Sequence, residues 1–227
     1  MQFDDYIVNQ SPPDFNYGEL TVVSSSRFSC LQPWFIDQVS DQLSYQLNQE
    51  ALLLNRPVVD IIDCTGNIGC DTILFRLLLP DADITVLEND QETFNALQEN
   101  MNHLDRITSD PDVKEIEAIN INCLDYIYNN GTDVMYFDPP WGGTSYKKNK
   151  YINLYLSKDG INYSIGTIIN QVLKENPCLV ILKSPYNFNY IQFVEEASDG
   201  LQLDIQNVDI KAPSGKISYV LSFIRLI

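Results

Sequence analysis

The sequence predicts an α/β fold: a doubly wound, mostly parallel sheet with an antiparallel hairpin at its C-terminal end. Short apolar, β-branched runs alternate with helix-like segments along most of the 227 residues, the pattern of parallel strands joined by crossover helices. The last two apolar runs are separated only by the turn-like KAPSGK. With 44% hydrophobic residues, the chain can bury one sizeable core. We therefore expect one domain, residues 34–227, preceded by an N-terminal arm, residues 1–33, that contributes to the site.

The arm is rich in Ser, Pro, Asn and Asp without clear periodicity, which favours irregular structure. A helix is predicted from Trp34 to about Leu54, because Pro33 suits a first helical turn and apolar residues then recur at helical spacing. A strand, a tight turn and a second helix follow in VVDIID, CTGNIG and DTILFRLLL, residues 58–79.

The remaining elements continue the alternation. Further strands are predicted at DITVLEND (83–90), IEAININ (116–122), DVMYFD (133–138) and CLVILKSP (178–185). Helices are predicted at ETFNALQENMNHL (92–104) and at about residues 161–175. The C-terminal hairpin would pair LQLDIQNVDI (201–210) with KISYVLSFIRLI (216–227).

The chain is strongly acidic, with 31 acidic and 14 basic residues and a formal charge of −17. This balance opposes broad, nonspecific binding to nucleic-acid phosphates, which depends on many Lys and Arg contacts. We expect any polynucleotide to be held locally.

The cysteines show no metal-ligand spacing. There are five, none in a CxxC pair, and His103 is the one histidine, so we expect no metal site. Reduced, mostly buried thiols and the lack of a signal-like or long apolar segment predict an intracellular protein, cytoplasmic or nuclear, that is neither secreted nor membrane-spanning. We expect a monomer.

The turn after the first predicted strand has the composition of a ligand-binding loop. In Asp63-Cys-Thr-Gly66-Asn67-Ile68-Gly69, glycines stand where the backbone turns sharply and approaches a ligand closely. Asn67 tolerates a left-handed backbone better than other non-glycine residues. The loop is not GxGxxG, and by itself it is a weak signal.

Two more carboxylates follow predicted strands at the same edge of the sheet. Glu88 lies 25 residues after Asp63, at the end of the second strand, where a carboxylate can accept both hydroxyls of a ribose. Asp125, in NCLDY, follows the third strand and could accept from an adenine amino group. Their repeated position at one edge favours a nucleoside-containing ligand.

The fourth loop, Asp138-Pro139-Pro140-Trp141, is the most specific feature of the sequence. The prolines fix the backbone and remove N–H donors, which leaves carbonyls pointing outward in a rigid turn. With Asp138, such carbonyls can accept both hydrogens of an exocyclic amine, and Trp141 offers a face on which a base can stack.

Together these motifs resemble the Rossmann-like S-adenosylmethionine-dependent (class I) methyltransferases that act on exocyclic amines of nucleobases. More narrowly, the chain is similar to the trimethylguanosine synthases, cap hypermethylases of eukaryotes with relatives in large DNA viruses. This narrower resemblance spans about residues 17–225 and rests on DPPWGG followed by Tyr, on SxxRFSCLQP and on LKSPYNF.

The resemblance implies a role for each matching residue. Asp63, Thr65, Gly66 and Gly69 would hold the methionine end of S-adenosylmethionine, Glu88 its ribose and Asp125 its adenine. Asp138, Pro139 and Pro140 would line the methyl-transfer point, with Asp138 also near the cofactor and Trp141 stacking on the methylated guanine. Phe28 and Ser29 would lie where cofactor and cap meet.

The implied reaction is transfer of methyl groups to N2 of a 7-methylguanosine RNA cap, giving di- or trimethylguanosine and S-adenosylhomocysteine. A 7-methylated guanine is cationic, which strengthens its stacking on Trp141 by roughly 0.5–2 kcal/mol. The cap phosphates would meet cations, for which the candidates are Arg27, Lys147, Lys148, Lys150 and, at the fifth strand, Lys183.

Two departures from the family pattern leave other functions open. The synthases usually have Ser where this chain has Asp138, and the first loop has fewer glycines. Asp at this position is common in enzymes that methylate adenine N6 or guanine N2 within RNA or DNA. A non-catalytic module that binds a cap or a partner protein is a further alternative.

Overall fold

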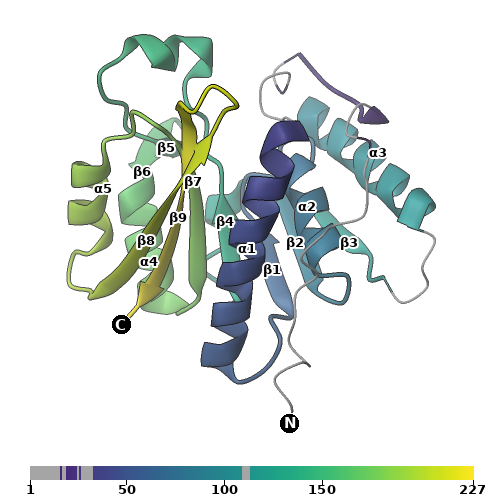
Figure 1. Ribbon diagram of the computed structural model, residues 1–227, viewed down its shortest axis with the longest axis horizontal. Coiled ribbons are helices and arrows are strands. Elements are labelled where there is room, and N and C mark those ends of the chain that lie inside the picture. Colours follow the sequence, from purple (N-terminus) through teal and green to yellow (C-terminus); the bar gives the residue numbers. More distant parts are fainter. Residues whose placement is uncertain (1–15, 17–18, 25, 27–32, 109–112) are drawn as a thin grey trace. The chain divides into compact units, whose positions relative to one another are not determined.

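The computed structural model describes residues 16, 19–24, 26, 33–108 and 113–227. The chain divides into two compact units, Met1–Ile121 and Asn122–Ile227 (Figure 1). Within the first unit the strands lie in the order β3-β2-β1, and within the second they lie in the order β4-β7-β9-β8.

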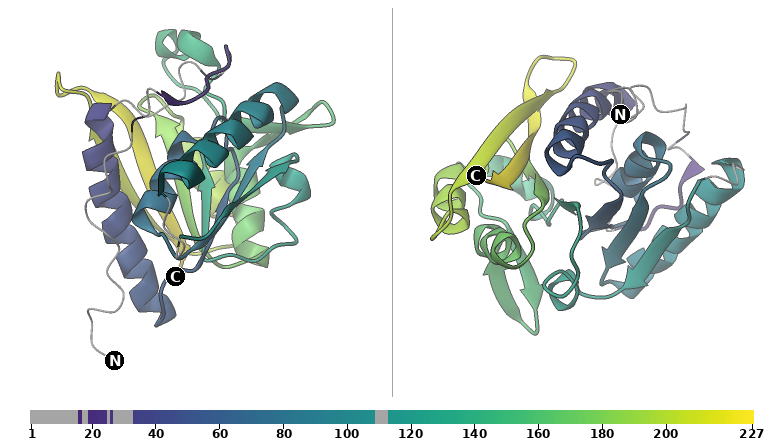
Figure 2. Two further views of the ribbon diagram at one scale, coloured as in Figure 1. Left: turned by 90° about the vertical axis from the view of Figure 1, so that its right-hand side faces the viewer. Right: turned by 90° about the horizontal axis from the view of Figure 1, so that it is seen from below.

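The first unit alternates strands and helices along the chain. Its elements are α1 (Pro33–Leu54), β1 (Asp60–Asp63), α2 (Cys70–Leu78), β2 (Asp83–Glu88), α3 (Gln91–Thr108) and β3 (Ile116–Asn120). The three strands are parallel. Helix α1 lies beside α2, and α2 and α3 pack against the strands (Figures 1 and 2).

The second unit combines parallel and antiparallel pairing. Its elements are η3 (Cys123–Asp125), β4 (Val134–Phe137), η4 (Gly143–Lys148), β5 (Tyr155–Lys158), β6 (Ile161–Ser164), α4 (Ile165–Glu175), β7 (Leu179–Pro185), α5 (Tyr190–Ala197), β8 (Leu203–Lys211) and β9 (Ile217–Leu226). Strand β4 is parallel to β7, and β9 is antiparallel to both β7 and β8. The β8–β9 hairpin is yellow in Figure 1, and β5 and β6 form a separate two-stranded sheet.

Strands β4 and β7 form the core of the second unit. Every residue of both strands is buried, as expected for central strands covered on both faces. Helices α4 and α5 pack closely at Gly166, where a Cβ atom would lie 2.7 Å from the Cβ of Glu196. Asn170 reinforces this contact because its Nδ2 donates to the backbone carbonyls of Ala197 and Asp199.

The predicted strand and helix order is confirmed, with one correction and two omissions. Residues 161–164 form strand β6 rather than the start of a helix, because Asp159 and Gly160 make a tight turn with positive φ angles of 51° and 76°. Helix α4 begins only after Ser164, whose hydroxyl accepts from the Thr167 N–H. Sequence reasoning did not predict α5 or the β5–β6 hairpin.

The cysteines only partly meet the expectation of reduced thiols. Cys64, Cys123 and Cys178 are free and buried, but Cys70, the first residue of α2, is disulfide-bonded.

Among the described residues, no helix combines the length and apolar character needed to cross a membrane.

Arg76 closes the C-terminal end of α2. Its guanidinium, with the residue only 2% exposed, donates from Nη1 to the carbonyl oxygens of Leu79, Pro80 and Ala82 at 3.1, 2.6 and 2.9 Å. Burial lowers the pKa of Arg76, and the nearby Asp105 opposes this shift. The side chain thus satisfies three carbonyls of the turn that follows α2.

We expect Arg76→Met to lower the free energy of unfolding by about 2–5 kcal/mol, because buried carbonyls would lose a charged donor. Urea unfolding followed by circular dichroism measures this. Arg106→Met is the matched control, since Arg106 is exposed and, among the described residues, bonds only to a carbonyl one turn back in α3. Equal, small effects of the two substitutions would contradict the proposed structural role.

Candidate active site

The glycine loop between β1 and α2 has the backbone that its sequence predicts. Asn67 and Gly69 have φ angles of 50° and 91°, so both lie in the left-handed region. A Cβ on Gly66 would lie 2.2 Å from Val86 Cγ2, and one on Gly69 would lie 2.4 Å from Met101 Cε. The close approach that requires these glycines is therefore to β2 and α3 of the protein itself.

Asp63 holds this loop through hydrogen bonds to its buried carboxylate. The residue is 1% exposed, and its Oδ1 accepts from the Thr65 N–H at 3.1 Å. Its Oδ2 accepts from the Thr72 hydroxyl in α2 at 2.6 Å. The carboxylate thus ties the end of β1 to the start of α2, which gives it a positioning role in the loop.

Glu88 joins the same loop from the end of β2. Its Oε2 accepts from the Asn67 N–H at 3.0 Å and its Oε1 from the Asp90 N–H at 2.8 Å. Burial raises the pKa of the Glu88 carboxyl, although these N–H groups lower it. A carboxylate can accept about four hydrogen bonds, so two backbone donors leave capacity for ligand hydroxyls. The first unit therefore brings Glu88 to the glycine loop, as the sequence predicted.

An unpredicted residue, Asn100, connects the arm to the glycine loop. Its Nδ2 donates to the carbonyls of Ile68 and Thr21, and its Oδ1 accepts from the Thr21 N–H at 2.7 Å. Asn100 is an ordinary polar residue of a helix in the sequence, so no local signal could have revealed this contact. Arg27, Phe28 and Ser29 lie outside the described residues.

The DPPW turn of the second unit is anchored by a buried ion pair. Phe137 and Leu182 are in register on the parallel strands β4 and β7, which places the next residues, Asp138 and Lys183, opposite each other. Lys183 Nζ lies 2.9 Å from Asp138 Oδ2, with the two side chains 6% and 17% exposed. It also lies 5.5 Å from the centre of the Tyr219 ring. Lys183 is thus paired with Asp138, and its assignment to the cap phosphates stays a prediction.

Trp141 lies within a cluster of aromatic rings. Its ring centroid is 5.4 Å from that of Tyr146 at an interplanar angle of 84°, and 6.4 Å from that of Tyr219 at 49°. The indole is half-buried, and its Nε1 finds no acceptor among the described residues. A buried donor without an acceptor costs stability, and such sites often serve binding. The edge-to-face contact with Tyr146 fixes the plane of the indole.

The segment after Trp141 is held in place by Asn187. Its Nδ2 donates to the carbonyls of Tyr146 and Asn149 at 2.9 and 2.8 Å. This anchors η4, on which Lys147 and Lys148 are exposed. Asn187 belongs to LKSPYNF, so the motif carried the signal although its role was not predicted.

Asp125 is engaged in a different interaction. Lys158 on β5 donates to Asp125 Oδ1, and this hydrogen bond raises the pKa of Lys158. Asn122 Nδ2 donates to the Ser157 carbonyl at 2.8 Å, which joins η3 to the same hairpin. The assignment of Asp125 to an adenine stays a prediction, and one of its oxygens already has a partner.

The acidic charge is unevenly distributed. Residues 1–121 contain 21 acidic and 5 basic residues, whereas residues 122–227 contain 10 and 9. The net charges are therefore −16 and −1. Within the described part of the chain, no group of three or more His, Cys, Asp or Glu residues could hold a metal ion.

Comparisons with solved structures confirm the predicted fold class. The chain resembles yhhF of Escherichia coli, provisionally named a methyltransferase, with a TM-score of 0.54, 14% identity and 92% of each chain covered. It resembles PH1948 of Pyrococcus horikoshii, provisionally named an RNA methyltransferase, with a TM-score of 0.51 and 12% identity. That match covers 92% of this chain and 95% of PH1948. The METTL16 MTase domain matches with a TM-score of 0.51 and 14% identity, over 83% of this chain and 68% of that domain. These likenesses show the Rossmann-like α/β fold of class I methyltransferases.

The sequence comparisons are more limited. No protein-family model matches the chain. A curated relative, "Uncharacterized protein L320" of Acanthamoeba polyphaga mimivirus, is 29% identical over 112 residues. That match covers 37% of this chain and 42% of the length of the relative.

The Asp138–Lys183 pair should stabilise the fold far more than an exposed pair. We expect Lys183→Met to lower the free energy of unfolding by about 3–5 kcal/mol, because Asp138 keeps a buried charge, and Asp138→Asn/Lys183→Met to recover part of this loss. Urea unfolding of the single and double variants gives the coupling energy.

The Asp125–Lys158 pair provides the matched control. Its side chains are 44% and 32% exposed, so Lys158→Met should lower the free energy of unfolding far less than Lys183→Met does. If the double-mutant cycle showed no coupling energy between Asp138 and Lys183, the proposed role of the buried pair would be contradicted.

Proposed function

We propose that the chain is an S-adenosylmethionine-dependent RNA methyltransferase that acts on the exocyclic N2 of a 7-methylguanosine cap. The observation that carries the proposal is the DPPW turn. There Asp138 is held by Lys183 at 2.9 Å, three residues before a half-buried tryptophan whose plane is fixed by Tyr146. A rigid acceptor beside an aromatic platform suits an amine on a flat base. Fold neighbours named as RNA methyltransferases support RNA as the substrate class.

The first unit has donor and acceptor groups that fit the cofactor. Glu88, already oriented by the N–H groups of Asn67 and Asp90, would accept from the ribose hydroxyls. The loop from Asp63 to Gly69 would hold the methionine end, with Asp63 acting through Thr65 and Thr72. The cofactor, when bound, supplies an electrophilic methyl group. The protein therefore has to bind, align and exclude water rather than create a nucleophile.

Asp138 is proposed to orient the amine. Its carboxylate oxygens accept hydrogen bonds, and the pairing with Lys183 fixes where they point. With the outward carbonyl of the Pro139–Pro140 turn, it would accept from the amine hydrogens, leave the nitrogen lone pair free to face the methyl donor and take up the proton that the amine loses late in the transfer. Trp141 would support the base, with a cation–π contribution when N7 is methylated.

A second candidate is methylation of an adenine amine or of an internal guanine. The observation that favours it is Asp138 itself, because the synthases that this chain resembles usually have Ser there. The ion pair with Lys183 offers another reason for an acid at this position, because the pair stabilises the fold whichever nucleobase is bound. We therefore retain the cap guanine as the main proposal.

The direct test is transfer of a labelled methyl group from S-adenosylmethionine to three substrates: 7-methylguanosine-capped RNA, the same RNA with an unmethylated cap, and uncapped RNA. We expect transfer to the first only. Trp141→Ala should abolish cap binding while cofactor affinity changes less than twofold, and Trp141→Phe should retain part of it, because a smaller ring still stacks. Equal labelling of all three RNAs, or cap binding that survives Trp141→Ala, would contradict the proposal.

Cofactor binding should depend on the ionisation of Glu88. Because burial raises the pKa of Glu88, affinity for S-adenosylhomocysteine should fall as the pH is lowered, beginning above the pH at which an ordinary glutamate protonates. Glu88→Gln should bind about 10–100-fold more weakly at neutral pH and lose this pH dependence. Isothermal titration calorimetry across pH measures both effects.

Weaker cofactor binding at low pH can be distinguished from acid unfolding, because protonation of Glu88 does not destabilise the folded protein. A carboxyl with a raised pKa stabilises the folded protein as the pH falls through that pKa, so protonation of Glu88 does not itself unfold the first unit. Glu92→Gln, at an exposed position in the first turn of α3, is the control and should leave the pH profile unchanged. An unchanged profile in Glu88→Gln would instead exclude Glu88 as the titrating group.

A further inference from the structure

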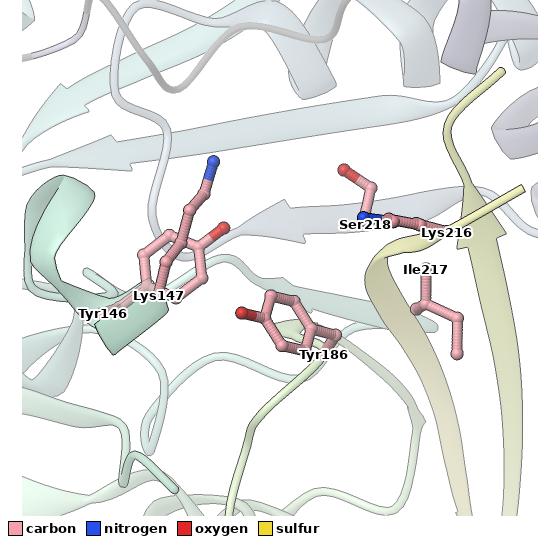
Figure 3. Close-up of a pocket in the computed structure, with 6 residues that line it drawn as sticks. All are labelled: Tyr146, Lys147, Tyr186, Lys216, Ile217 and Ser218. Carbon is pink, nitrogen blue, oxygen red and sulfur yellow. The ribbon is translucent and has the colours of Figure 1, made fainter. Parts of the chain in front are cut away.

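The second unit contains a pocket of which only Lys147 has been assigned a binding role above, as a candidate for the cap phosphates. It has a volume of about 550 Å³ and is lined by Tyr146, Lys147, Tyr186, Lys216, Ile217 and Ser218 (Figure 3). Tyr146 and Lys147 come from η4, Tyr186 follows β7, and the other three lie at the turn of the β8–β9 hairpin. Three segments that are distant in the sequence thus converge on one cavity.

The lining chemistry suits an anion that carries an aromatic group. The side chains provide two phenol rings, two ammonium groups, a hydroxyl and an isoleucine, and none of the six is acidic. Ammonium groups attract phosphate and aromatic faces stack on bases, which is the usual combination in sites for single-stranded nucleic acid. This lining contrasts with the formal charge of −17 on the whole chain.

The size of the pocket exceeds that needed for a phosphate. A volume of about 550 Å³ falls within the roughly 300–1,000 Å³ typical of small-molecule sites. A base and its sugar can therefore enter with the phosphate.

Tyr146 links the pocket to Trp141, the proposed platform of the target base. The Tyr146 ring lies 5.4 Å from Trp141 on one side and 6.3 Å from Tyr186 on the other. Trp141, Tyr146 and Tyr186 therefore form a row of rings that leads from the DPPW turn into the pocket. A polynucleotide that placed one base on Trp141 would bring its neighbouring nucleotide along this row.

We propose that the pocket between Tyr146 and Tyr186 binds the RNA nucleotide that follows the methylated base, so that the protein recognises capped RNA chains rather than the cap alone. This inference rests on the proposed function, because it takes Trp141 as the platform of the target base. Tyr186, 48% exposed, offers its ring to the base of that nucleotide. Lys147 and Lys216 neutralise the phosphates on either side.

The pocket walls are already ordered for this task. Asn187 fixes the backbone that carries Tyr146, and burial raises the pKa of the Tyr146 phenol, so the phenol stays protonated and can donate to a phosphate. The Lys216 carbonyl accepts from the Ala212 N–H at 2.9 Å, which closes the hairpin turn that presents Lys216. Pre-ordered walls reduce the entropy lost on binding.

The test compares the affinities of three probes: 7-methylguanosine triphosphate, a capped tetranucleotide and the same tetranucleotide without a cap. We expect the wild-type protein to bind the capped tetranucleotide most tightly. Tyr186→Ala should weaken that binding about 10-fold and change the affinity for 7-methylguanosine triphosphate less than twofold. Lys216→Ala should reduce the slope of log affinity against log salt by about 0.7 for the tetranucleotide. Fluorescence anisotropy measures all of these.

Tyr45→Ala and Lys174→Ala are the matched controls, because both residues are exposed on helices, α1 and α4, away from the pocket lining. Both should leave every affinity unchanged. Equal losses for the cap analogue and the tetranucleotide in Tyr186→Ala would overturn the proposal, as would no loss for either. If the wild-type protein showed no preference for the cap while Tyr186→Ala still weakened binding of the uncapped tetranucleotide, the nucleotide pocket would stand and the proposed cap function would fail.

Discussion

The buried ion pair between Asp138 and Lys183 is the constraint on which the candidate substrate site depends. Two opposite charges lie side by side, Asp138 directly after β4 and Lys183 within β7, and every residue of both strands is buried. Separating them would leave a desolvated charge, so the ends of β4 and β7 and the turn that follows β4 are locked together. The position of Trp141, three residues later, follows from this lock, and Tyr219 on β9 packs against both the ammonium group and the indole.

The ion pair with Lys183 also changes how Asp138 in the DPPW turn is interpreted. An isolated aspartate beside a reacting amine suggests a general base, and its departure from serine suggests a different target base. Pairing with Lys183 gives Asp138 a second reason to be present, because the lysine in β7 needs a counter-charge. The carboxylate then acts by orientation, which is the larger requirement when the methyl donor is itself a strong electrophile.

Local patterns predicted most of the fold, and contacts between distant segments account for what they missed. The apolar runs of β4 and β7, the glycine loop and the left-handed Asn67 could all be inferred, since each depends on neighbouring residues. Strand β6 differs from the predicted helix because INYS is too short to show a strand period, and the left-handed Asp159–Gly160 turn before it sets the pairing with β5. The roles of Asn100, Asn187 and Lys183 depend on partners 79, 41 and 45 residues away in the sequence, which no pattern within one segment could reveal. The net charge was also misleading as a whole-chain value, because residues 122–227 carry only −1 of it.

The central claim is that the accepting atom is N2 of a 7-methylated cap guanine. The most direct measurement is to react the protein with a 7-methylguanosine-capped RNA that also contains internal adenosines and guanosines, digest the product to nucleosides and identify the methylated species by mass spectrometry. The account predicts 2,7-dimethylguanosine or 2,2,7-trimethylguanosine from the cap and unmodified internal nucleosides. N6-methyladenosine, or N2-methylguanosine from internal positions with an unchanged cap, would contradict it.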